Sequence, residues 1–359
     1  MSKKIVLTGG GTAGHVTPNM ALIPGLKDMG FDIKYIGSYD GIEKKLIEEM
    51  DVSYQGISSG KLRRYFSAKN FTDPFRVIKG YGEAKKIIKN YKPDVLFSKG
   101  GFVSVPVILA AKKYKVPIII HESDMTPGLA NKISIPYAHT VCHNFPETAK
   151  YLPEGKALLT GSPIRQELKQ GDKLAGLNMC GFSANKPIIM VIGGSLGAVA
   201  VNEAVRSSLD ELLKTYQIVH LCGKGKTDDS LNNRSGYKQF EYIKAELKDL
   251  FAMSDIIISR AGANAICEIV ALRKPSILIP LSAKASRGDQ ILNADSFKHQ
   301  GFSEVIQEED ITSEILVSTI NSVYGNRQKY IDAIDNAGAT DAVKTILNLI
   351  QELTKNDSQ

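Results

Sequence analysis

A glycine-rich segment follows the first apolar run of the chain and offers backbone amides to an anion. Residues 5–8 are apolar, and Gly9-x-Gly11-x-x-Gly14 follows them directly. Glycines let a backbone approach an anion closely, and amides at a helix N-terminus point at its oxygens. A dinucleotide site would also need a carboxylate ending the second strand, which instead ends at Gly37-Ser38. We therefore favour an anion or diphosphate site over a dinucleotide site or a purely structural turn.

His15 follows the last of these glycines, at the predicted start of a helix. The helix dipole disfavours a charged imidazolium there, so we expect a neutral imidazole near pH 7. A neutral imidazole can take a proton from a hydroxyl, although a helix-capping or buried structural histidine is the alternative. Glu122 and Asp124, after a later strand, are the other candidate bases. In an open α/β sheet these loops share the carboxyl edge, where ligands bind.

The second half of the chain repeats the strand–glycine turn–helix pattern about 184 residues later. Ser195 and the amides of the 193–197 turn fit a diphosphate, and Arg165 lies just past the predicted linker at 159–163. We expect Glu268 in the first turn of a helix, where a carboxylate suits a ribose diol or merely complements the helix dipole. Gln290 follows a later strand, in a run of donors and acceptors that fits sugar hydroxyls. The sequence has no D-x-D motif, so it does not indicate a metal ion that would hold a nucleotide sugar.

Short apolar runs alternate with amphipathic stretches along the whole chain, which predicts parallel, right-handed βαβ units. The fold class is α/β, with two doubly wound, Rossmann-like parallel sheets. Predicted strands are Lys4–Thr8, Ile33–Ile36, Val95–Phe97, Ile118–Ile120, Thr140–Cys142, Ile188–Ile192, Gln217–Leu221, Asp255–Ile258 and Ser276–Ile279. Predicted helices include Met20–Met29, Tyr81–Asn90, Ala200–Lys214 and Ala265–Leu272. A last helix at 341–353 has an apolar stripe that should pack on a domain rather than on a partner.

Composition and charge narrow the class of protein. A chain of 359 residues suggests two domains. Residues 1–160 hold 23 Lys+Arg and 14 Asp+Glu, a net charge of +9, whereas the remainder is slightly acidic. Most of the excess lies in Gly60–Lys92, which has ten basic and two acidic residues interleaved with aromatic and aliphatic ones. This segment is either a solvated basic face or a patch that meets an anionic membrane surface.

The cysteines and the N-terminus point to a cytosolic protein. The four cysteines are at least 38 residues apart and predict neither a metal site nor a redox motif. We expect no signal peptide and no membrane-spanning run. An RNA-binding protein could use the same basic stripe, but it would need exposed aromatic platforms and no paired phosphate loops, so we expect no nucleic-acid partner.

Seven motifs, in order and along essentially the whole chain, resemble the MurG family of peptidoglycan synthesis, the undecaprenyldiphospho-muramoylpentapeptide β-N-acetylglucosaminyltransferases. Their combined order and spacing make the resemblance specific. The motifs are GGGTAGHVTP at 9–18, KGGFVSVP at 99–106, HESDMTPGLANK at 121–132, GSPIR at 161–165, GGSLGA at 193–198, SRAGANAICE at 259–268 and RGDQILNA at 287–294.

The resemblance implies a type B glycosyltransferase fold, with two Rossmann-like domains facing across a cleft. It implies an N-terminal acceptor domain at 1–161, a C-terminal donor domain at 162–340 and a terminal helix at 341–359 that packs back toward the first domain. The implied reaction is inverting transfer of N-acetylglucosamine from UDP-N-acetylglucosamine to the muramoyl 4-hydroxyl of lipid I, without a metal or cofactor. The implied location is the cytoplasmic face of the cell membrane, peripherally bound, with other cell-wall synthesis proteins as further partners.

The resemblance also assigns roles to residues. It places His15 in catalysis and Ser195 and Arg165 on the donor diphosphate. Ile243 corresponds to a backbone contact with uracil, Glu268 to the ribose-binding glutamate and Gln290 to a glutamine that reads sugar hydroxyls. The first loop, with Thr12, Ala13, Gly14 and His15, and the later loop with Asp124 belong to the acceptor side.

The sequence departs from the family pattern at three positions. Asp124 stands where an asparagine is frequent, Asp289 where a glutamine is common, and Ala13 where a glycine is usual. An aspartate keeps the acceptor half of an amide's hydrogen bonding but loses its donor half. Two enzymes of similar fold are alternatives: a UDP-N-acetylglucosamine 2-epimerase, against which the basic aromatic segment argues, and a diacylglycerol-dependent glycolipid synthase, against which the 121–131 motif argues.

Overall fold

The computed structural model describes residues 2–60, 73–194, 197–283, 288–338 and 341–355. The chain forms two compact units, residues 1–165 with 340–359 and residues 166–339. The division between the units comes at 165/166, a few residues after the predicted boundary at 161/162.

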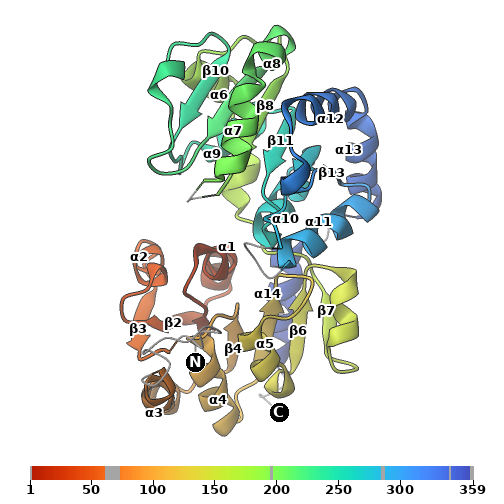
Figure 1. Cartoon of the computed structure of the whole chain (residues 1–359). Helices are drawn as coiled ribbons and strands as arrows, with labels where there is room; N and C mark the ends of the chain where they lie inside the picture. The colour runs from red at the N-terminus through yellow and green to blue at the C-terminus, as the bar shows by residue number, and fades with distance from the viewer. Residues whose placement is uncertain (1, 61–72, 195–196, 284–287, 339–340, 356–359) are drawn as a thin grey trace. The chain divides into compact units, whose positions relative to one another are not determined.

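The first unit is a seven-stranded parallel sheet with the strand order β3-β2-β1-β4-β5-β6-β7 (Figure 1). Its strands are β1 (Lys4–Thr8), β2 (Asp32–Ser38), β3 (Ser53–Ile57), β4 (Val95–Ser98), β5 (Ile118–Glu122), β6 (Thr140–His143) and β7 (Ala157–Leu159). Its helices are α1 (Thr17–Asp28), α2 (Ile42–Glu48), α3 (Asp73–Tyr91), α4 (Ser104–Lys113), α5 (Leu129–Ser134) and α14 (Ala342–Lys355). The central strands are buried on both faces, which explains their unbroken apolar sequences.

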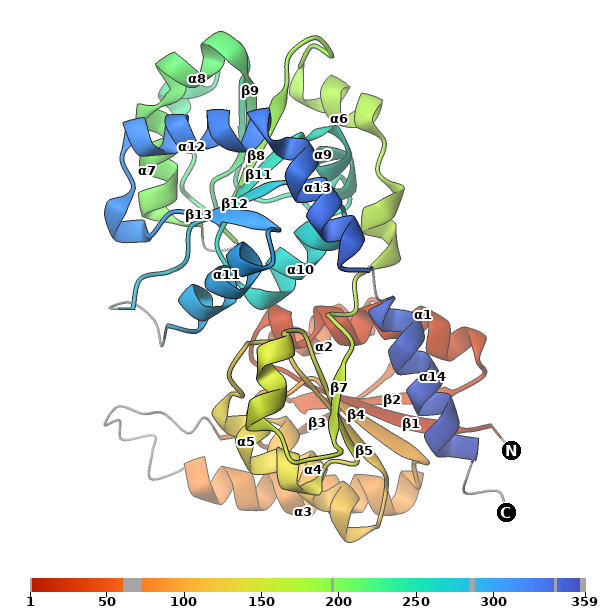
Figure 2. The same ribbon diagram turned by 90° about the vertical axis from the view of Figure 1, so that its right-hand side faces the viewer.

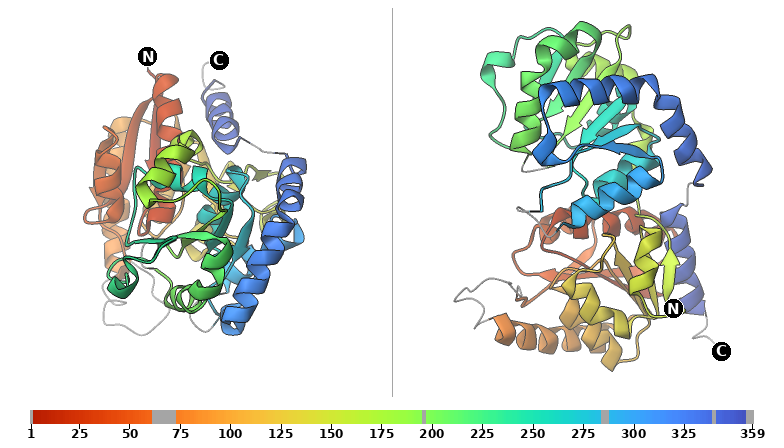
Figure 3. Two further views of the ribbon diagram at one scale, coloured as in Figure 1. Left: turned by 90° about the horizontal axis from the view of Figure 1, so that it is seen from above. Right: turned by 45° about the vertical axis from the view of Figure 1, so that its right-hand side comes forward.

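The second unit is a six-stranded parallel sheet with the strand order β10-β9-β8-β11-β12-β13. Its strands are β8 (Ile188–Ile192), β9 (Gln217–Leu221), β10 (Tyr237–Phe240), β11 (Ile256–Ser259), β12 (Ser276–Leu278) and β13 (Ser303–Val305). Its helices are α6 (Lys173–Cys180), α7 (Val199–Ser207), α8 (Leu209–Thr215), α9 (Leu247–Met253), α10 (Ala263–Ala271), α11 (Asp289–His299), α12 (Ser313–Gly325) and α13 (Arg327–Asn336). Figure 3 shows α12, in blue, running across this sheet next to α7, in green.

All nine predicted strands are present, three of them with the predicted ends and the others with ends that differ by one to two residues. The four strands that the sequence did not reveal, β3, β7, β10 and β13, are the four edge strands of the two sheets. The sequences SYQGI in β3, YKQF in β10 and SEV in β13 mix polar and apolar residues, whereas β7, with the sequence ALL, is only three residues long. An edge strand has a neighbour on one side only and is more exposed to water, so it lacks the continuous apolar run of a central strand.

The helices α1 and α10 match the predictions to within one to three residues at each end, whereas two other helices differ more. The predicted helix at 200–214 is divided into α7 and α8, with Ser208 at the junction, where its hydroxyl donates to the carbonyl oxygen of Ala204 at 2.7 Å. Hydrogen bonding of a serine to the backbone often bends or ends a helix. The predicted helix at 81–90 is the second half of the longer α3.

The terminal helix α14 belongs to the first unit, although it follows the second unit in the chain. It lies beside α1 (Figure 2). Ile346 and Ile350 of α14 are fully buried in the same core cluster as Ile5, Leu22 and Phe97, and Val343 and Leu347 pack against that cluster. The apolar stripe of this helix therefore packs on its own chain.

Candidate active site

Both sheets reverse their strand order at one point, and the glycine turns of the sequence lie at these points. In the first sheet β1 lies between β2 and β4, so the loops after β1 and β4 leave the sheet in opposite directions. In the second sheet β8 has the same place between β9 and β11. Ligands of open α/β sheets bind at the carboxyl ends of the strands where this reversal occurs. Each unit therefore has one candidate binding edge.

In the first unit, the loops after β1 and β4 come into direct contact. Gly101, after β4, has a φ of +86°, a conformation that favours glycine. A Cβ atom at Gly101 would lie 2.4 Å from the carbonyl oxygen of Gly10, in the loop after β1. The glycines are thus needed for two backbones to meet at this edge.

His15 ends the short helix Ala13–His15 within the first loop. Its Nδ1 atom lies 3.0 Å from the carbonyl oxygen of Gly10 and 3.3 Å from Thr12 Oγ1. A carbonyl oxygen only accepts, so Nδ1 is the protonated nitrogen and Nε2 has the lone pair. Burial, and next the positive charge of Lys99, lower the pKa of His15 below its usual range. His15 is therefore a neutral imidazole whose Nε2 atom can accept a proton.

Buried polar side chains hold this loop in place. Glu43, in the first turn of α2, accepts hydrogen bonds from the amides of Gly11 at 3.2 Å and Ser38 at 3.0 Å. Asn19 donates to the carbonyl oxygen of Thr8 at 3.2 Å and to Tyr35 Oη at 3.0 Å. None of the three side chains, Glu43, Asn19 or Tyr35, was singled out from the sequence. Glu43 lies far from the loop in the sequence, and polar residues of this kind are usually exposed.

Strand β5 ends at Glu122, which is almost completely buried. One of its oxygens accepts the amide of Asp124 at 3.0 Å, and the other accepts the amide of Gly128 at 3.0 Å and Asn131 Nδ2 at 2.8 Å. Burial, and next the charge of Asp124, raise the pKa of Glu122. Both oxygens of Glu122 accept from residues of the loop and helix that follow β5. Glu122 therefore holds this loop in place and is a poor candidate for the general base. Asp124 is half-buried at the same edge.

Lys99 is a further residue of this edge, which the sequence motif contains but which was not assigned a role. It follows β4 directly, is 1% exposed, and donates a hydrogen bond to Ser123 Oγ in the loop after β5. A lysine between a buried strand and two glycines could have indicated such a buried cation. Thr12 and Ala13 are exposed and Gly14 is half-buried, so the first loop of the site also offers surface to a ligand.

In the second unit, the loop after β8 is also shaped by close backbone contact. Gly197 has a φ of +67°, and a Cβ atom there would lie 1.9 Å from the carbonyl oxygen of Cys222 after β9. Ser195, predicted to contact the diphosphate, lies outside the described residues. Across the point of strand reversal, Arg260 follows β11, donates to the carbonyl oxygens of Ile279 and Pro280 at 3.1 and 3.2 Å, and pairs with Glu308.

The prediction that Glu268 lies in the first turn of its helix is wrong. Helix α10 begins at Ala263, so Glu268 lies in its second turn, and no acidic residue lies in the first. The attraction between a carboxylate and a helix dipole falls off within the first turn, so the dipole does not explain a glutamate at this position. Glu268 is half-buried, like Ile243, which follows β10.

Gln290 is in the first turn of α11, and its Oε1 atom accepts the amide of Leu281 after β12 at 3.0 Å. Asn293, one turn later, donates to the carbonyl oxygen of Ala261 at 3.3 Å. These two bonds tie α11 to the loops after β12 and β11. Gln290 and Glu268 thus belong to elements of the same sheet edge, whereas Arg165 belongs to the other unit, at the end of its first segment.

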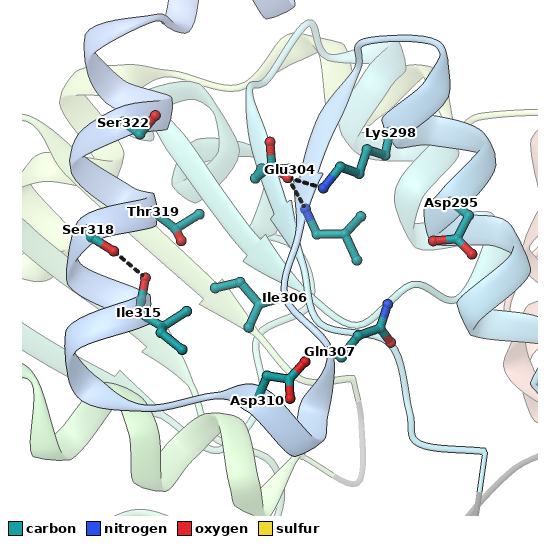
Figure 4. A pocket seen from close by; sticks show the side chains of 11 residues that line it. Asp295, Lys298, Glu304, Ile306, Gln307, Asp310, Ile315, Ser318, Thr319 and Ser322 are labelled. Atoms are coloured by element: carbon teal, nitrogen blue, oxygen red, sulfur yellow. Dashed lines mark hydrogen bonds and ion pairs between the residues drawn. The ribbon is translucent and has the colours of Figure 1, made fainter.

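A hollow of about 630 Å³ in the second unit lies apart from these residues, between α11 and α12 along the edge strand β13 (Figure 4). Lys298 and Glu304 form an ion pair of 2.6 Å across it. None of the predicted site residues is among the residues that line it.

The described residues contain neither a cluster of metal ligands nor a membrane-spanning helix. In the described parts of the chain, no three His, Cys, Asp or Glu side chains gather as metal ligands would. Within the same parts, no helix combines the length and the apolar character needed to cross a bilayer.

Comparison with known proteins decides the family. Residues 5–143 match the glycosyltransferase family 28 N-terminal domain, and residues 188–350 match the glycosyltransferase family 28 C-terminal domain. The chain belongs to glycosyltransferase family 28. The predicted resemblance and the predicted type B fold are confirmed, because both family domains are present in order and each contains one parallel sheet.

Individual members show how close the similarity is. A protein of Lachnoclostridium phytofermentans is 64% identical over 351 residues, which are 98% of this chain and 99% of that protein. It is named UDP-N-acetylglucosamine--N-acetylmuramyl-(pentapeptide) pyrophosphoryl-undecaprenol N-acetylglucosamine transferase. The crystal structure of Acinetobacter baumannii MurG is 25% identical, with a TM-score of 0.77 over 98% of this chain and 99% of that one.

The epimerase alternative shares the fold of this family. The UDP-GlcNAc 2-epimerase from Methanocaldococcus jannaschii covers 98% of this chain and 100% of its own with a TM-score of 0.67, but it is only 13% identical. This similarity shows a common fold. The much higher identity to a named transferase separates the two families.

Proposed function

We propose that this chain is an inverting glycosyltransferase that moves N-acetylglucosamine from UDP-N-acetylglucosamine to the 4-hydroxyl of the muramoyl sugar of lipid I, making lipid II. The identity of 64% along nearly the whole chain to a transferase named for these substrates supports the substrate pair. The observation that supports the chemistry is the neutral His15, whose Nδ1 faces the carbonyl oxygen of Gly10 and whose Nε2 has a lone pair.

In the proposed mechanism, the muramoyl 4-hydroxyl oxygen attacks the anomeric carbon of the donor sugar. The bond from that carbon to the UDP oxygen breaks, UDP leaves with the bonding electrons, and the configuration inverts. The hydroxyl proton passes to Nε2 of His15, and Nδ1 holds the ring against Gly10 throughout. Thr12, Ala13, Gly14 and Asp124 form the acceptor side of this site.

We also propose roles for the residues that bind UDP-N-acetylglucosamine. Ser195 and Arg165 contact the diphosphate, Ile243 contacts the uracil through its backbone, Glu268 accepts from the ribose diol and Gln290 contacts the sugar hydroxyls. Backbone amides of the 193–197 turn and Arg165 offset the charge on the departing UDP, so no metal ion is required.

Incubation with labelled UDP-N-acetylglucosamine and a lipid I analogue tests the reaction. Formation of a disaccharide lipid with one equivalent of UDP supports it. Free N-acetylmannosamine formed without acceptor would instead identify an epimerase, and the absence of both products would leave only a nucleotide-sugar-binding protein.

Replacing His15 by alanine tests the proposed base. We expect the His15→Ala variant to lose about 10²- to 10⁴-fold in kcat while its affinity for UDP-N-acetylglucosamine stays unchanged, because only the proton acceptor is removed. His139 is exposed, so His139→Ala is the matched control. Near-normal turnover of His15→Ala would contradict the role of His15.

We also propose that the enzyme binds peripherally to the cytoplasmic face of the cell membrane through Gly60–Lys92. Residues 61–72 of this segment lie outside the described residues. In the described part, helix α3 exposes Phe75 by 75% and Ile78 by 68%, with Arg76 and Lys79 exposed beside them. Exposed apolar side chains next to cations can bind an anionic lipid surface. The proposed acceptor, lipid I, lies in such a membrane. Other cell-wall synthesis proteins are further proposed partners.

A further inference from the structure

The buried lysine at the edge of the first sheet plays no part in the mechanism described so far. Lys99 is 1% exposed, and its amide donates to the carbonyl oxygen of Thr8 at 2.9 Å, which fixes it beside the end of β1. The start of its side chain lies against the first glycine loop, since a Cβ atom on Gly9 would lie 3.2 Å from Lys99 Cβ. Burial of an ammonium group is costly, so a lysine here needs compensating partners.

The ammonium group of Lys99 links two loops of the candidate site. Its Nζ atom donates to Ser123 Oγ, in the loop after β5, and the carbonyl oxygen of Ser123 in turn accepts from Asn144 Nδ2 at 3.0 Å. The next residue is Asp124, whose amide is held by Glu122. Lys99 thus fixes the start of the segment that bears the acceptor-side carboxylate.

The charges around His15 come from three different elements. Lys99, from the loop after β4, opposes protonation of His15, whereas Asp124, from the loop after β5, and Glu43, from α2, favour it. The Gly10 carbonyl oxygen and Thr12 Oγ1 contact Nδ1 of the ring. Lys99 is the only cation among these groups, and it offsets two carboxylates.

We propose that Lys99 is a positioning residue for the glycosyl transfer, acting on His15 by its charge and on the Ser123–Asp124 segment by its hydrogen bond. Because Lys99 is 1% exposed, we assign it a role through its neighbours and not through contact with the substrate. Without its charge, the two carboxylates would favour the imidazolium form, which has no lone pair on Nε2 and cannot accept the proton of the sugar hydroxyl. This inference rests on the proposed role of His15.

Two measurements on the whole protein test the inference. In the Lys99→Met variant, which keeps the length of the side chain but removes its charge, we expect the acidic limb of the kcat/KM profile to move up by about one pH unit. Activity at pH 8 should fall much less than activity at pH 6. A purely structural role for Lys99 would lower activity equally at all pH values. Lys99→Arg, which keeps the charge, should retain the original limb, and Lys113→Met, at an exposed position of α4, is the matched control.

The second measurement is the NMR titration of His15 in the protein without substrate, assigned with His15→Gln. It is independent of enzymatic activity, so it separates failure of this inference from failure of the proposed function. We expect His15 to titrate below pH 6.5 in the natural protein and higher in Lys99→Met. An unchanged titration in Lys99→Met would overturn the inference. If that variant does not fold, titration of the natural protein's His15 at or above pH 6.5 would overturn it as well.

Discussion

At the scale of residues, the candidate site of the first unit is made of buried polar groups whose partners restrict what each can do. Glu122, at the end of β5, and His15, in the loop after β1, are both titratable and lie at the same edge of the sheet. Glu122 uses both oxygens as acceptors, so its place in the structure depends on its being a carboxylate surrounded by donors. His15 uses one nitrogen and leaves the other for chemistry. Hydrogen-bond partners therefore separate a structural acid from a candidate base.

The contacts of Glu122 predict a large effect of a small substitution. In Glu122→Gln, an NH2 group replaces one carboxylate oxygen. This NH2 group faces either the amide of Asp124, or the amide of Gly128 together with Asn131 Nδ2. All of these groups are donors, so at least one buried donor loses its acceptor. We expect the free energy of unfolding to fall by about 1–3 kcal/mol. Urea denaturation measures this, with the exposed Glu154→Gln as the control. Equal stability of the two variants would show that these contacts are dispensable.

At the scale of elements, the loops do the chemistry and the strands decide where the loops lie. Helix α3 bears the two most exposed large apolar side chains among the described residues. Phe75 and Ile78 are three residues apart and thus lie on one face of the helix, where they are strongly exposed. A soluble protein seldom exposes neighbouring large apolar groups without a partner surface.

This exposure predicts membrane binding through α3. The double substitution Phe75→Ser with Ile78→Ser should weaken binding to vesicles containing anionic lipid by about tenfold or more, because both side chains lose their transfer into lipid. Added salt should weaken binding of the natural protein, since the cations of α3 are screened. Cosedimentation measures both effects, with Ile315→Ser as a control at an exposed residue of α12. Binding that ignores both the substitutions and salt would exclude this surface.

At the scale of the whole molecule, the chain passes from the first unit to the second and then returns. Helix α14 supplies Ile346 and Ile350 to the core of the first unit, more than 300 residues after β1. Folding of the first unit is therefore complete only when the last helix is in place. The entropy lost on closing a loop grows only slowly with the number of residues in the loop, so a return over such a long stretch of chain is tolerated.

The return of α14 predicts that a substitution near the C-terminus weakens the N-terminal sheet. Ile350→Ala should lower the stability of the first unit by about 2–4 kcal/mol, because it leaves a cavity in a fully buried core. Amide hydrogen exchange should accelerate in β1 and β4 but not in β8 and β11. Asn348→Ala, at an exposed position on the same helix, is the control. Equal acceleration in both sheets would contradict the assignment of α14 to the first unit.

The sequence by itself determined the class of fold, the central strands and the family. Central strands are buried on both faces and keep an apolar signature, and glycine turns keep their spacing because backbone contacts such as that of Gly101 with Gly10 admit no side chain. The sequence did not reveal the four edge strands, because three of them have mixed compositions and β7 is only three residues long. Only the tertiary structure showed Glu268 in the second turn of α10, Glu43 beneath the first loop, and Lys99 buried beside His15. Partners in such contacts are remote in the sequence, so the order of strands across the sheet decides which side chains meet.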